Sequence, residues 1–231
     1  MSDQLVLWDI DGTLLNADGV GRDLYDVVFV QLFGRSIEAF APMAGRTDRA
    51  IILETLTMAG VSEPRRYVDP FIAGLTAQAP SVRSLVAARG RALPGACDVL
   101  RGLHGRAHQS VLTGNIRPVA EVKLAALGLQ DGLDLCIGAY GDDHEVRAEL
   151  VHVARRRASA VHGRSPSDFG GASTVVIGDT PLDIEAALVS GARAVGVATG
   201  SYSAADLAAA GAHAVLPNLT DTNAVLRALL P

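Results

Sequence analysis

The chain has 231 residues, enough for one hydrophobic core and a modest second domain. With 49% apolar and 19% charged residues, its composition is that of a globular protein, which excludes an intrinsically disordered one. The net charge of −5 argues against nucleic acid or an anionic membrane surface as a partner.

The cysteine and leader patterns bear on the cellular compartment. Cys97 and Cys136 lack the spacing of a zinc or redox motif, and we expect both to be small buried residues of a reducing compartment. No basic start precedes an apolar segment, and no apolar run reaches membrane-spanning length. We therefore expect a cytoplasmic protein with no membrane contact.

The first element along the chain is an apolar run, Leu5 to Trp8, that leads directly into Asp9 and Asp11. Such a run is typical of a buried strand in a parallel sheet. Gly12 indicates that the backbone leaves the strand there. Two acids held close together repel each other unless a cation or a shared proton offsets the charge. The simpler interpretation is a strand end with two solvated acids before a turn.

A helical segment follows this strand. Apolar residues recur at helical spacing over four stretches, and no alternating strand pattern interrupts them. The predicted helices cover 22–33, 48–58 after an N-cap at Thr47, 64–79 and 81–89. We interpret residues 16–92 as an inserted all-α cap domain between two parts of an α/β core, residues 1–15 and 93–231.

The remainder of the chain alternates between helices and strands, which indicates a Rossmann-like parallel sheet with right-handed crossovers. Within it, the three-arginine run from Arg155 to Arg157 is expected to form a solvated helix face. The predicted strands cover 109–112, 133–137, 173–177, 194–198 and 214–216, and the predicted helices 96–103, 118–127, 145–162, 181–188, 204–210 and 220–230.

Polar residues follow three of these strands. Asp9 and Asp11 end the first, and the run Thr113-Gly114-Asn115 ends the second. Asp179 ends a later strand and has Asp183 one helical turn beyond it. Because the carboxyl ends of parallel strands meet at one edge of a sheet, we expect these residues to form one site. Taken singly, Thr113 also suits a helix cap and Asp179 a turn.

The run Asp-Ile-Asp-Gly-Thr-Leu-Leu from Asp9 resembles the first motif of the haloacid dehalogenase (HAD) superfamily, in its phosphatase branch. Leu-Thr-Gly-Asn at Thr113 and Gly-Asp-Thr-Pro-Leu-Asp at Asp179 resemble the second and fourth motifs. The resemblance implies that Asp9 attacks phosphorus and that Asp11 is the acid and base. It also implies Mg²⁺ on the Asp9 and Asp179 carboxylates and the Asp11 carbonyl, with Asp183 in support.

The phosphate of the substrate needs donors, because a carboxylate that attacks a phosphate dianion meets like-charge repulsion. The expected catalytic donors are Thr113 and Lys123. Arg46 either pairs with a substrate anion or only begins the cap helix after it. Further phosphate contacts are expected, with the family, at Ile10, Gly12, Thr13, Gly114 and Asn115.

One departure concerns the third motif. Many relatives carry its lysine in a Lys-Pro dipeptide shortly before the fourth motif, and this chain has no such dipeptide. We take Lys123, the sole lysine, as the replacement, because it lies on the helix that follows Thr113. Arg147, in the stretch where the dipeptide would stand, ranks second.

The helical insert is similar to the cap of phosphoglycolate-phosphatase-like members, and Asp11 favours phosphoryl chemistry over dehalogenation. The leading hypothesis is a Mg²⁺-dependent phosphatase, monomeric or homodimeric, that acts on a small phosphorylated metabolite. A phosphomutase of the β-phosphoglucomutase type is the alternative among enzymes. A non-catalytic HAD-fold binding protein ranks last, since the nucleophile, the acid and the metal ligands are all present.

Overall fold

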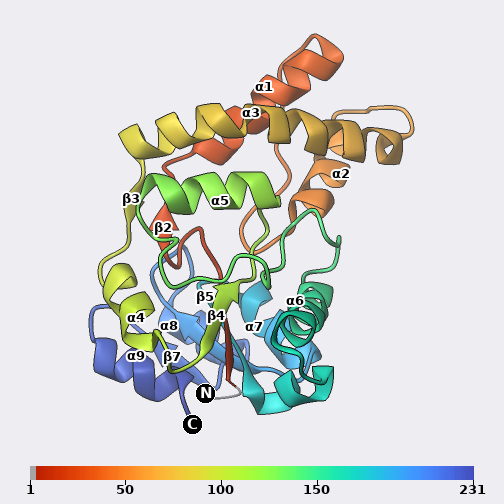
Figure 1. The fold of residues 1–231 in the computed structure, drawn as a ribbon. Helices are drawn as coiled ribbons and strands as arrows, with labels where there is room; N and C mark the ends of the chain where they lie inside the picture. The colour runs from red at the N-terminus through yellow and green to blue at the C-terminus, as the bar shows by residue number, and fades with distance from the viewer. Residues whose placement is uncertain (1–3) are drawn as a thin grey trace.

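The computed structural model describes residues 4–231 of the chain. Its core is a five-stranded, fully parallel sheet, so the predicted α/β architecture is confirmed (Figure 1). The strand order is β4-β1-β5-β6-β7, from β4 (His108–Val111), β1 (Leu5–Trp8), β5 (Thr174–Gly178), β6 (Arg193–Val197) and β7 (Ala214–Leu216).

The first strand divides the hydrophobic core in two. All four residues of β1 are fully buried, and they alternate between the faces of the sheet. Val6 and Trp8 pack with α4 (Ala96–Leu103), α5 (Arg117–Ala126) and α9 (Thr222–Leu229). Leu5 and Leu7 pack with α6 (Arg147–His162), α7 (Pro181–Val189) and α8 (Ala204–Ala209). Burial on both faces explains why β1 reads as a continuous apolar run.

The insert lies over the carboxyl ends of the strands, next to α5 (Figure 1). It contains α1 (Val20–Phe33), α2 (Asp48–Met58), the 3₁₀ helix η1 (Pro64–Tyr67) and α3 (Val68–Arg89). A short antiparallel ribbon, β2 (Leu15–Asn16) with β3 (Arg91–Ala92), joins it to the core. The sequence did not indicate this ribbon. It lies where the domain boundaries were placed, and the two-domain division itself stays a prediction.

The helix α3 corrects the expected break at Pro80. The structure has one helix of 22 residues there, with Pro80 inside it, and the 3₁₀ helix η1 directly precedes it. A proline removes one helical hydrogen bond and usually ends or bends a helix. Here the buried stripe that includes Phe71, Leu75 and Val82 continues across Pro80, and packing of that stripe favours a single helix.

Among residues 4–231, neither α3 nor any other helix is long and apolar enough to cross a membrane.

The strand predicted over 133–137 is wrong. The segment turns instead, because the Asp134 carboxylate accepts a hydrogen bond from the Cys136 amide, which closes a local turn. A single parallel bridge between Leu112 and Ala139 is formed further on. The connection before β5 likewise contains two short 3₁₀ helices, η2 (Pro166–Phe169) and η3 (Gly171–Ser173).

Two further expectations are corrected. Cys97 and Cys136 are both exposed, not buried. Arg155 is buried rather than solvated: its guanidinium donates to the Thr174 hydroxyl (3.0 Å) and to the Ser190 carbonyl (2.8 Å). A buried guanidinium must find such acceptors, and helix periodicity alone does not reveal where they lie.

Candidate active site

The registers of β1 with its two neighbours bring three strand ends to one level. Trp8 lies opposite Val111 of β4 and Ile177 of β5, so the polar residues that follow each strand leave the sheet together. The Asp9 amide continues the ladder to the Ile177 carbonyl (2.9 Å), and the Leu112 amide continues it to the Trp8 carbonyl (2.8 Å). The predicted convergence of Asp9, Thr113 and Asp179 is therefore present in the structure.

The turn after β1 explains Gly12. Its φ of 88° is one that residues with a side chain rarely adopt, and a Cβ there would run into the Asp179 carboxylate. The Ile10 side chain is in the core, and the buried Thr13 hydroxyl donates to Asp179 Oδ1 (3.2 Å). The Thr13 side chain therefore holds Asp179 in place. The phosphate contacts expected at Ile10, Gly12 and Thr13 stay predictions.

The loop after β4 offers a hydroxyl donor. Thr113 is fully buried, and its Oγ1 accepts hydrogen bonds from the Asn115 amide (3.2 Å) and from Asn115 Nδ2 (2.8 Å). Since these two bonds use both lone pairs of the oxygen, the hydroxyl hydrogen remains to donate elsewhere. Thr113, Gly114 and Asn115 all line one cavity with Asp9, which suits their expected contact with a phosphate.

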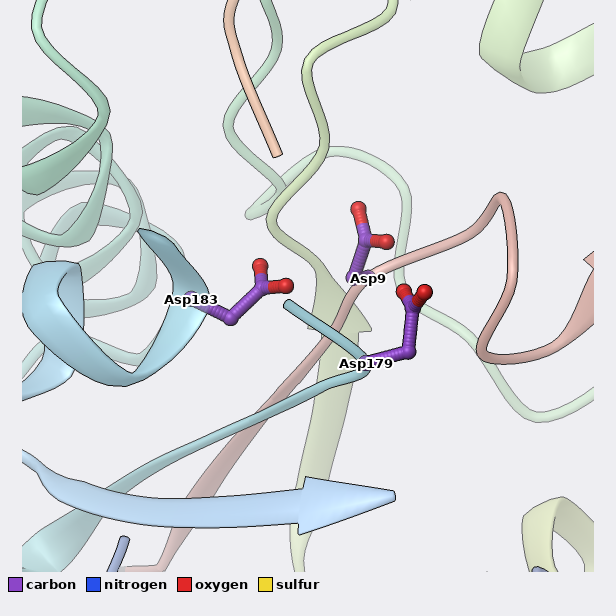
Figure 2. Close-up of side chains that lie close together, drawn as sticks. All are labelled: Asp9, Asp179 and Asp183. Carbon is purple, nitrogen blue, oxygen red and sulfur yellow. The ribbon is translucent and has the colours of Figure 1, made fainter. Parts of the chain in front are cut away.

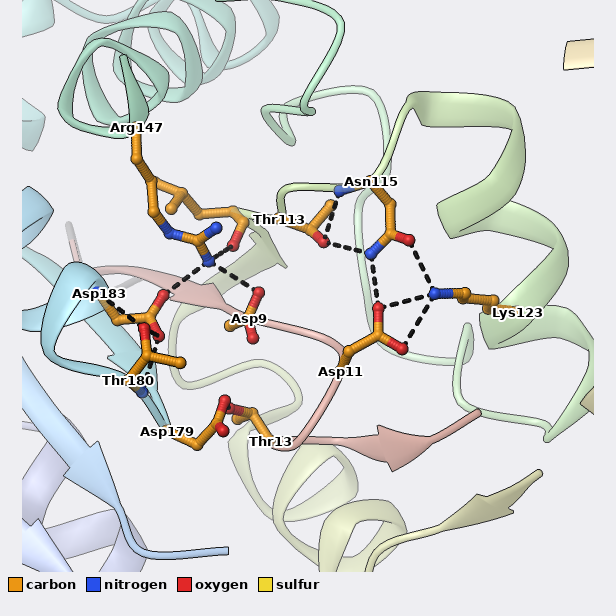
Figure 3. A network of polar contacts seen from close by, with 11 residues as sticks. Asp9, Asp11, Thr13, Thr113, Asn115, Lys123, Arg147, Asp179, Thr180 and Asp183 are labelled. Carbon is orange, nitrogen blue, oxygen red and sulfur yellow. Dashed lines mark hydrogen bonds and ion pairs between the residues drawn. The ribbon is translucent and has the colours of Figure 1, made fainter. Parts of the chain in front are cut away.

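The two candidate cations, Lys123 and Arg147, contact different aspartates (Figure 3). Lys123 Nζ donates to both oxygens of Asp11 (2.9 and 2.7 Å) and to Asn115 Oδ1 (2.7 Å). Arg147 Nη2 donates to Asp9 Oδ1 (2.8 Å) and to Asp183 Oδ1 (2.6 Å). The cation that contacts the expected nucleophile, Asp9, is thus Arg147, the second candidate for the role of the third-motif lysine. Lys123, the first candidate, contacts Asp11.

Arg147 is almost completely buried, and its side chain is 7% exposed. Burial alone would lower the pKa of Arg147, but the ion pairs with Asp183 and Asp9 raise it, so the guanidinium stays charged. A single nitrogen makes the contacts, while the buried Nε has no hydrogen-bond partner among the described residues. The signal for Arg147 in the sequence was its place in the stretch where many relatives carry the Lys-Pro dipeptide, and the structure makes it the first residue of α6.

Asp183 lies in the first turn of α7 and supports the site. Its Oδ2 accepts hydrogen bonds from the Thr180 amide (3.0 Å) and hydroxyl (2.7 Å), in a capping box that stabilises the start of the helix. Its Oδ1 accepts a hydrogen bond from Arg147 Nη2. With these contacts made, Asp183 fits the supporting role expected for it better than that of a principal ligand.

Three buried carboxylates could hold a metal ion. Asp9, Asp179 and Asp183 each offer one oxygen, and these oxygens lie within 4.8 Å of one another (Figure 2). Burial, followed by the charge of Asp183, raises the pKa of Asp179 to about 7 and raises the pKa of Asp9 well above its ordinary value. Such shifts show that burial, together with repulsion between the carboxylates, makes their ionised forms costly in the metal-free protein. A cluster of carboxylate oxygens with excess negative charge fits a hard divalent cation such as Mg²⁺.

We expect stability without metal to fall as the pH rises from 4 to 8. Asp9 and Asp179 bind protons more tightly folded than unfolded, so the folded state loses its advantage as they ionise. The loss should be on the order of 3 kcal/mol. Urea unfolding in EDTA at pH 5 and pH 8 measures it, and Mg²⁺ should restore more stability at pH 8 than at pH 5. Asp179→Asn should weaken both effects, whereas a greater Mg²⁺ effect at pH 5 would contradict the assignment.

A cavity of about 530 Å³ lies between core and insert. The residues of the core that line it include Asp9, Asp11, Thr113, Lys123, Arg147 and Asp179. The insert contributes Arg22, Tyr25 and Met43 to its wall, and Arg46 also lies there. The Arg46 guanidinium pairs with Glu54 (2.5 Å), so a contact between Arg46 and a substrate stays a prediction.

The loop after β6 also lines the cavity, with residues 199–201. The sequence did not indicate this loop as part of the site. The Thr199 hydroxyl donates to the Gly12 carbonyl (2.6 Å). Gly200 is required because a Cβ there would overlap the Asp179 carboxylate. The available signal for this loop was its position directly after a parallel strand, where the other three strands also place residues of the site.

Comparisons with known proteins identify the family and the fold. The model of the haloacid dehalogenase-like hydrolase family matches residues 6–188. A hydrolase from Pseudomonas syringae is similar in structure, with a TM-score of 0.67 at 20% identity, and the match covers 99% of each chain. A predicted phosphatase from Clostridium acetobutylicum gives 0.64 at 17% identity, covering 98% of this chain and 100% of the other.

A protein from Bacteroides vulgatus, to which β-phosphoglucomutase activity is attributed, gives a TM-score of 0.65 at 18% identity over 98% of this chain and 88% of the other. A comparison with curated proteins by sequence gave no match. At these identities the structural matches establish the fold, whereas the family model extends over more than half of the chain. The chain therefore belongs to the haloacid dehalogenase-like hydrolase family.

Proposed function

We propose that this hydrolase is a Mg²⁺-dependent phosphatase that hydrolyses a small phosphorylated metabolite, in the manner of a phosphoglycolate phosphatase. The observation that carries the proposal is the position of Asp9. Its carboxylate is buried at the base of a cavity, with Arg147 on one side and Asp179 on the other. Carboxylate nucleophiles that form covalent intermediates are a known route for phosphoryl transfer.

In the proposed reaction an Asp9 oxygen attacks phosphorus, the bond from phosphorus to the substrate oxygen breaks, and Asp11 gives its proton to the leaving oxygen. Water then attacks the aspartyl-phosphate, Asp11 takes a proton from that water, and inorganic phosphate leaves. Mg²⁺, held by Asp9, Asp179 and the Asp11 carbonyl with Asp183 in support, would neutralise charge between carboxylate and phosphate.

The chain's own residues orient the groups. Arg147 fixes the Asp9 carboxylate. The proposed donors to the phosphate oxygens are the Thr113 hydroxyl and the Gly114 amide, both from residues that line the cavity, whereas the Asn115 amide donates to Thr113 Oγ1. Lys123 holds Asp11 through both oxygens. A bound phosphate dianion would compete for Lys123 and release one Asp11 oxygen, which is then free to carry the proton.

The test is phosphate release from a panel of phosphorylated metabolites with and without Mg²⁺. We expect release from at least one substrate, lost in EDTA and lost in Asp9→Asn. A phosphomutase would use the same Asp9 and Asp11, so isomerisation of a sugar phosphate without net phosphate release would select that alternative. The cytoplasmic location and the monomeric or homodimeric state remain predictions.

Lys123→Ala should lower kcat by about 10²-fold, because it removes the cation beside Asp11 and beside the loop that follows β4, residues 112–116, named the phosphate loop below. Lys123→Arg should recover part of the loss, since the positive charge is kept on the same helix. Steady-state kinetics on the best substrate of the panel measures both. Activity of Lys123→Ala near that of the wild type would remove Lys123 from the proposed mechanism.

A further inference from the structure

An aspartate of the insert, Asp48, contacts the phosphate loop directly. Asp48 is the first residue of α2, and only 7% of it is exposed. Its backbone amide donates to the Gly114 carbonyl (2.7 Å), and its Oδ2 accepts from the Ile116 amide (2.7 Å). These two bonds lie on either side of Asn115, so one residue of the insert holds the loop at two points.

The bond to Ile116 adds a second distant acceptor at the start of α5, beside Asp142, whose Oδ1 accepts from the Arg117 amide (3.0 Å). Ile116 is the N-cap residue of α5 and has no side-chain group that could accept a hydrogen bond. Asp48 provides the acceptor from 68 positions away in the sequence, and places a carboxylate at the positive end of the helix. Because α5 also carries Lys123, the same contact bears on the position of that side chain.

The orientation of the Asp48 carboxylate is set from a third element. The buried Tyr25 hydroxyl, on α1, donates to Asp48 Oδ1 (2.6 Å). Burial raises the pKa of Asp48 to about 6, against the opposing effect of the bonds from Tyr25 and Ile116. The group is therefore ionised at neutral pH, although its ionisation is costly at this place.

Two glycines let the backbones meet closely. A Cβ on Gly114 would run into the Arg46 carbonyl, and one on Gly141 would run into the Gly114 carbonyl. In the same seam, the Arg49 amide donates to the Gly141 carbonyl (3.2 Å) and the Thr47 hydroxyl to the Glu145 carbonyl (2.8 Å). The segment 47–49 is thus seated on two loops of the core, and both loops border the site.

We infer that Asp48 is a positioning residue that couples the seating of the insert to the geometry of the phosphate loop. The inference rests on the proposed function. If the insert moves away, the Gly114 carbonyl and the Ile116 amide lose their partners and the loop relaxes. Phosphate binding and seating of the insert then favour each other, as two events linked through one element must.

The test compares Asp48→Asn with Asp23→Asn, a matched change at another aspartate in the first turn of an insert helix. Asp23 is exposed and pairs with Arg89 (2.7 Å), which lies outside the segment 47–49. In Asp48→Asn one carboxylate oxygen becomes an amide nitrogen, which cannot accept, so either Ile116 or Tyr25 loses its acceptor. Tyr25→Phe is the milder variant, because it leaves both oxygens in place.

Three readouts separate positioning from simple stabilisation. Asp48→Asn should speed hydrogen exchange of the Ile116 amide by about tenfold and raise the inhibition constant of inorganic phosphate by about tenfold. It should also lower kcat/KM by more than the loss of stability, measured as the fall in melting temperature, would explain. Tyr25→Phe should change them in the same direction by less. Asp23→Asn should leave all three unchanged.

A lower melting temperature of Asp48→Asn with unchanged exchange, phosphate inhibition and KM would overturn the inference, and so would unchanged values in Tyr25→Phe if Asp48→Asn does not fold. The exchange measurement needs no turnover. Faster exchange at Ile116 in a protein that releases phosphate from no substrate would therefore reject the proposed function and keep Asp48 as the residue that holds the loop.

Discussion

Asp9→Asn is expected to lower phosphate release by about 10⁴-fold or more, because a carboxamide cannot act as the nucleophile. The variant should still fold. Burial and the charge of Asp183 raise the pKa of Asp9, so removal of its charge relieves repulsion in the metal-free protein. The asparagine oxygen can also keep the bond from Arg147. Loss of activity without loss of stability would thus point to chemistry rather than to unfolding.

The measurement is colorimetric phosphate release with Mg²⁺, accompanied by thermal unfolding of the same samples. Asp98→Asn is the control, because Asp98 is an exposed aspartate on α4 that pairs only locally with Arg101. Intact-protein mass after a brief exposure to substrate should show phosphorylated protein for the wild type and none for Asp9→Asn. Retention of more than about a tenth of the activity by Asp9→Asn would exclude Asp9 as the nucleophile.

Arg147→Met should destabilise the metal-free protein by about 3–5 kcal/mol at neutral pH, the usual consequence of removing one partner from a buried ion pair. The change leaves Asp9 and Asp183 facing each other without the cation that contacts both. It should also lower kcat, since the nucleophile loses the donor that orients it. Urea unfolding and steady-state kinetics measure the two effects.

Arg147→Lys distinguishes charge from shape. Because one terminal nitrogen of Arg147 contacts both acids and Nε is unpartnered within the described chain, a lysine ammonium can replace most of the interaction. We expect Arg147→Lys to keep most of the stability that Arg147→Met loses. Wild-type stability and activity in Arg147→Met would show that the buried pair has no part in the site.

The chain order of elements and the site motifs were predictable because they depend on local pattern. A continuous apolar run specifies a strand covered on both faces, and polar residues at the ends of parallel strands meet at one edge. This reasoning placed Asp9, Thr113 and Asp179 together, which the sheet registers then confirmed. The same local reasoning failed at Pro80 and over 133–137, where packing across α3 and the side chain of Asp134 decided the backbone.

The sequence by itself determined the parallel α/β core, the helical insert after the first strand, and the acids that gather at the strand ends. Only the tertiary structure decided which cation meets which acid: Arg147 with Asp9, and Lys123 with Asp11. It also decided that Asp48, which in sequence looks like an ordinary first-turn acid, caps a distant helix. Hydrophobic periodicity records the face that a residue occupies, whereas the partner of a buried charge depends on how elements far apart in the chain are packed together.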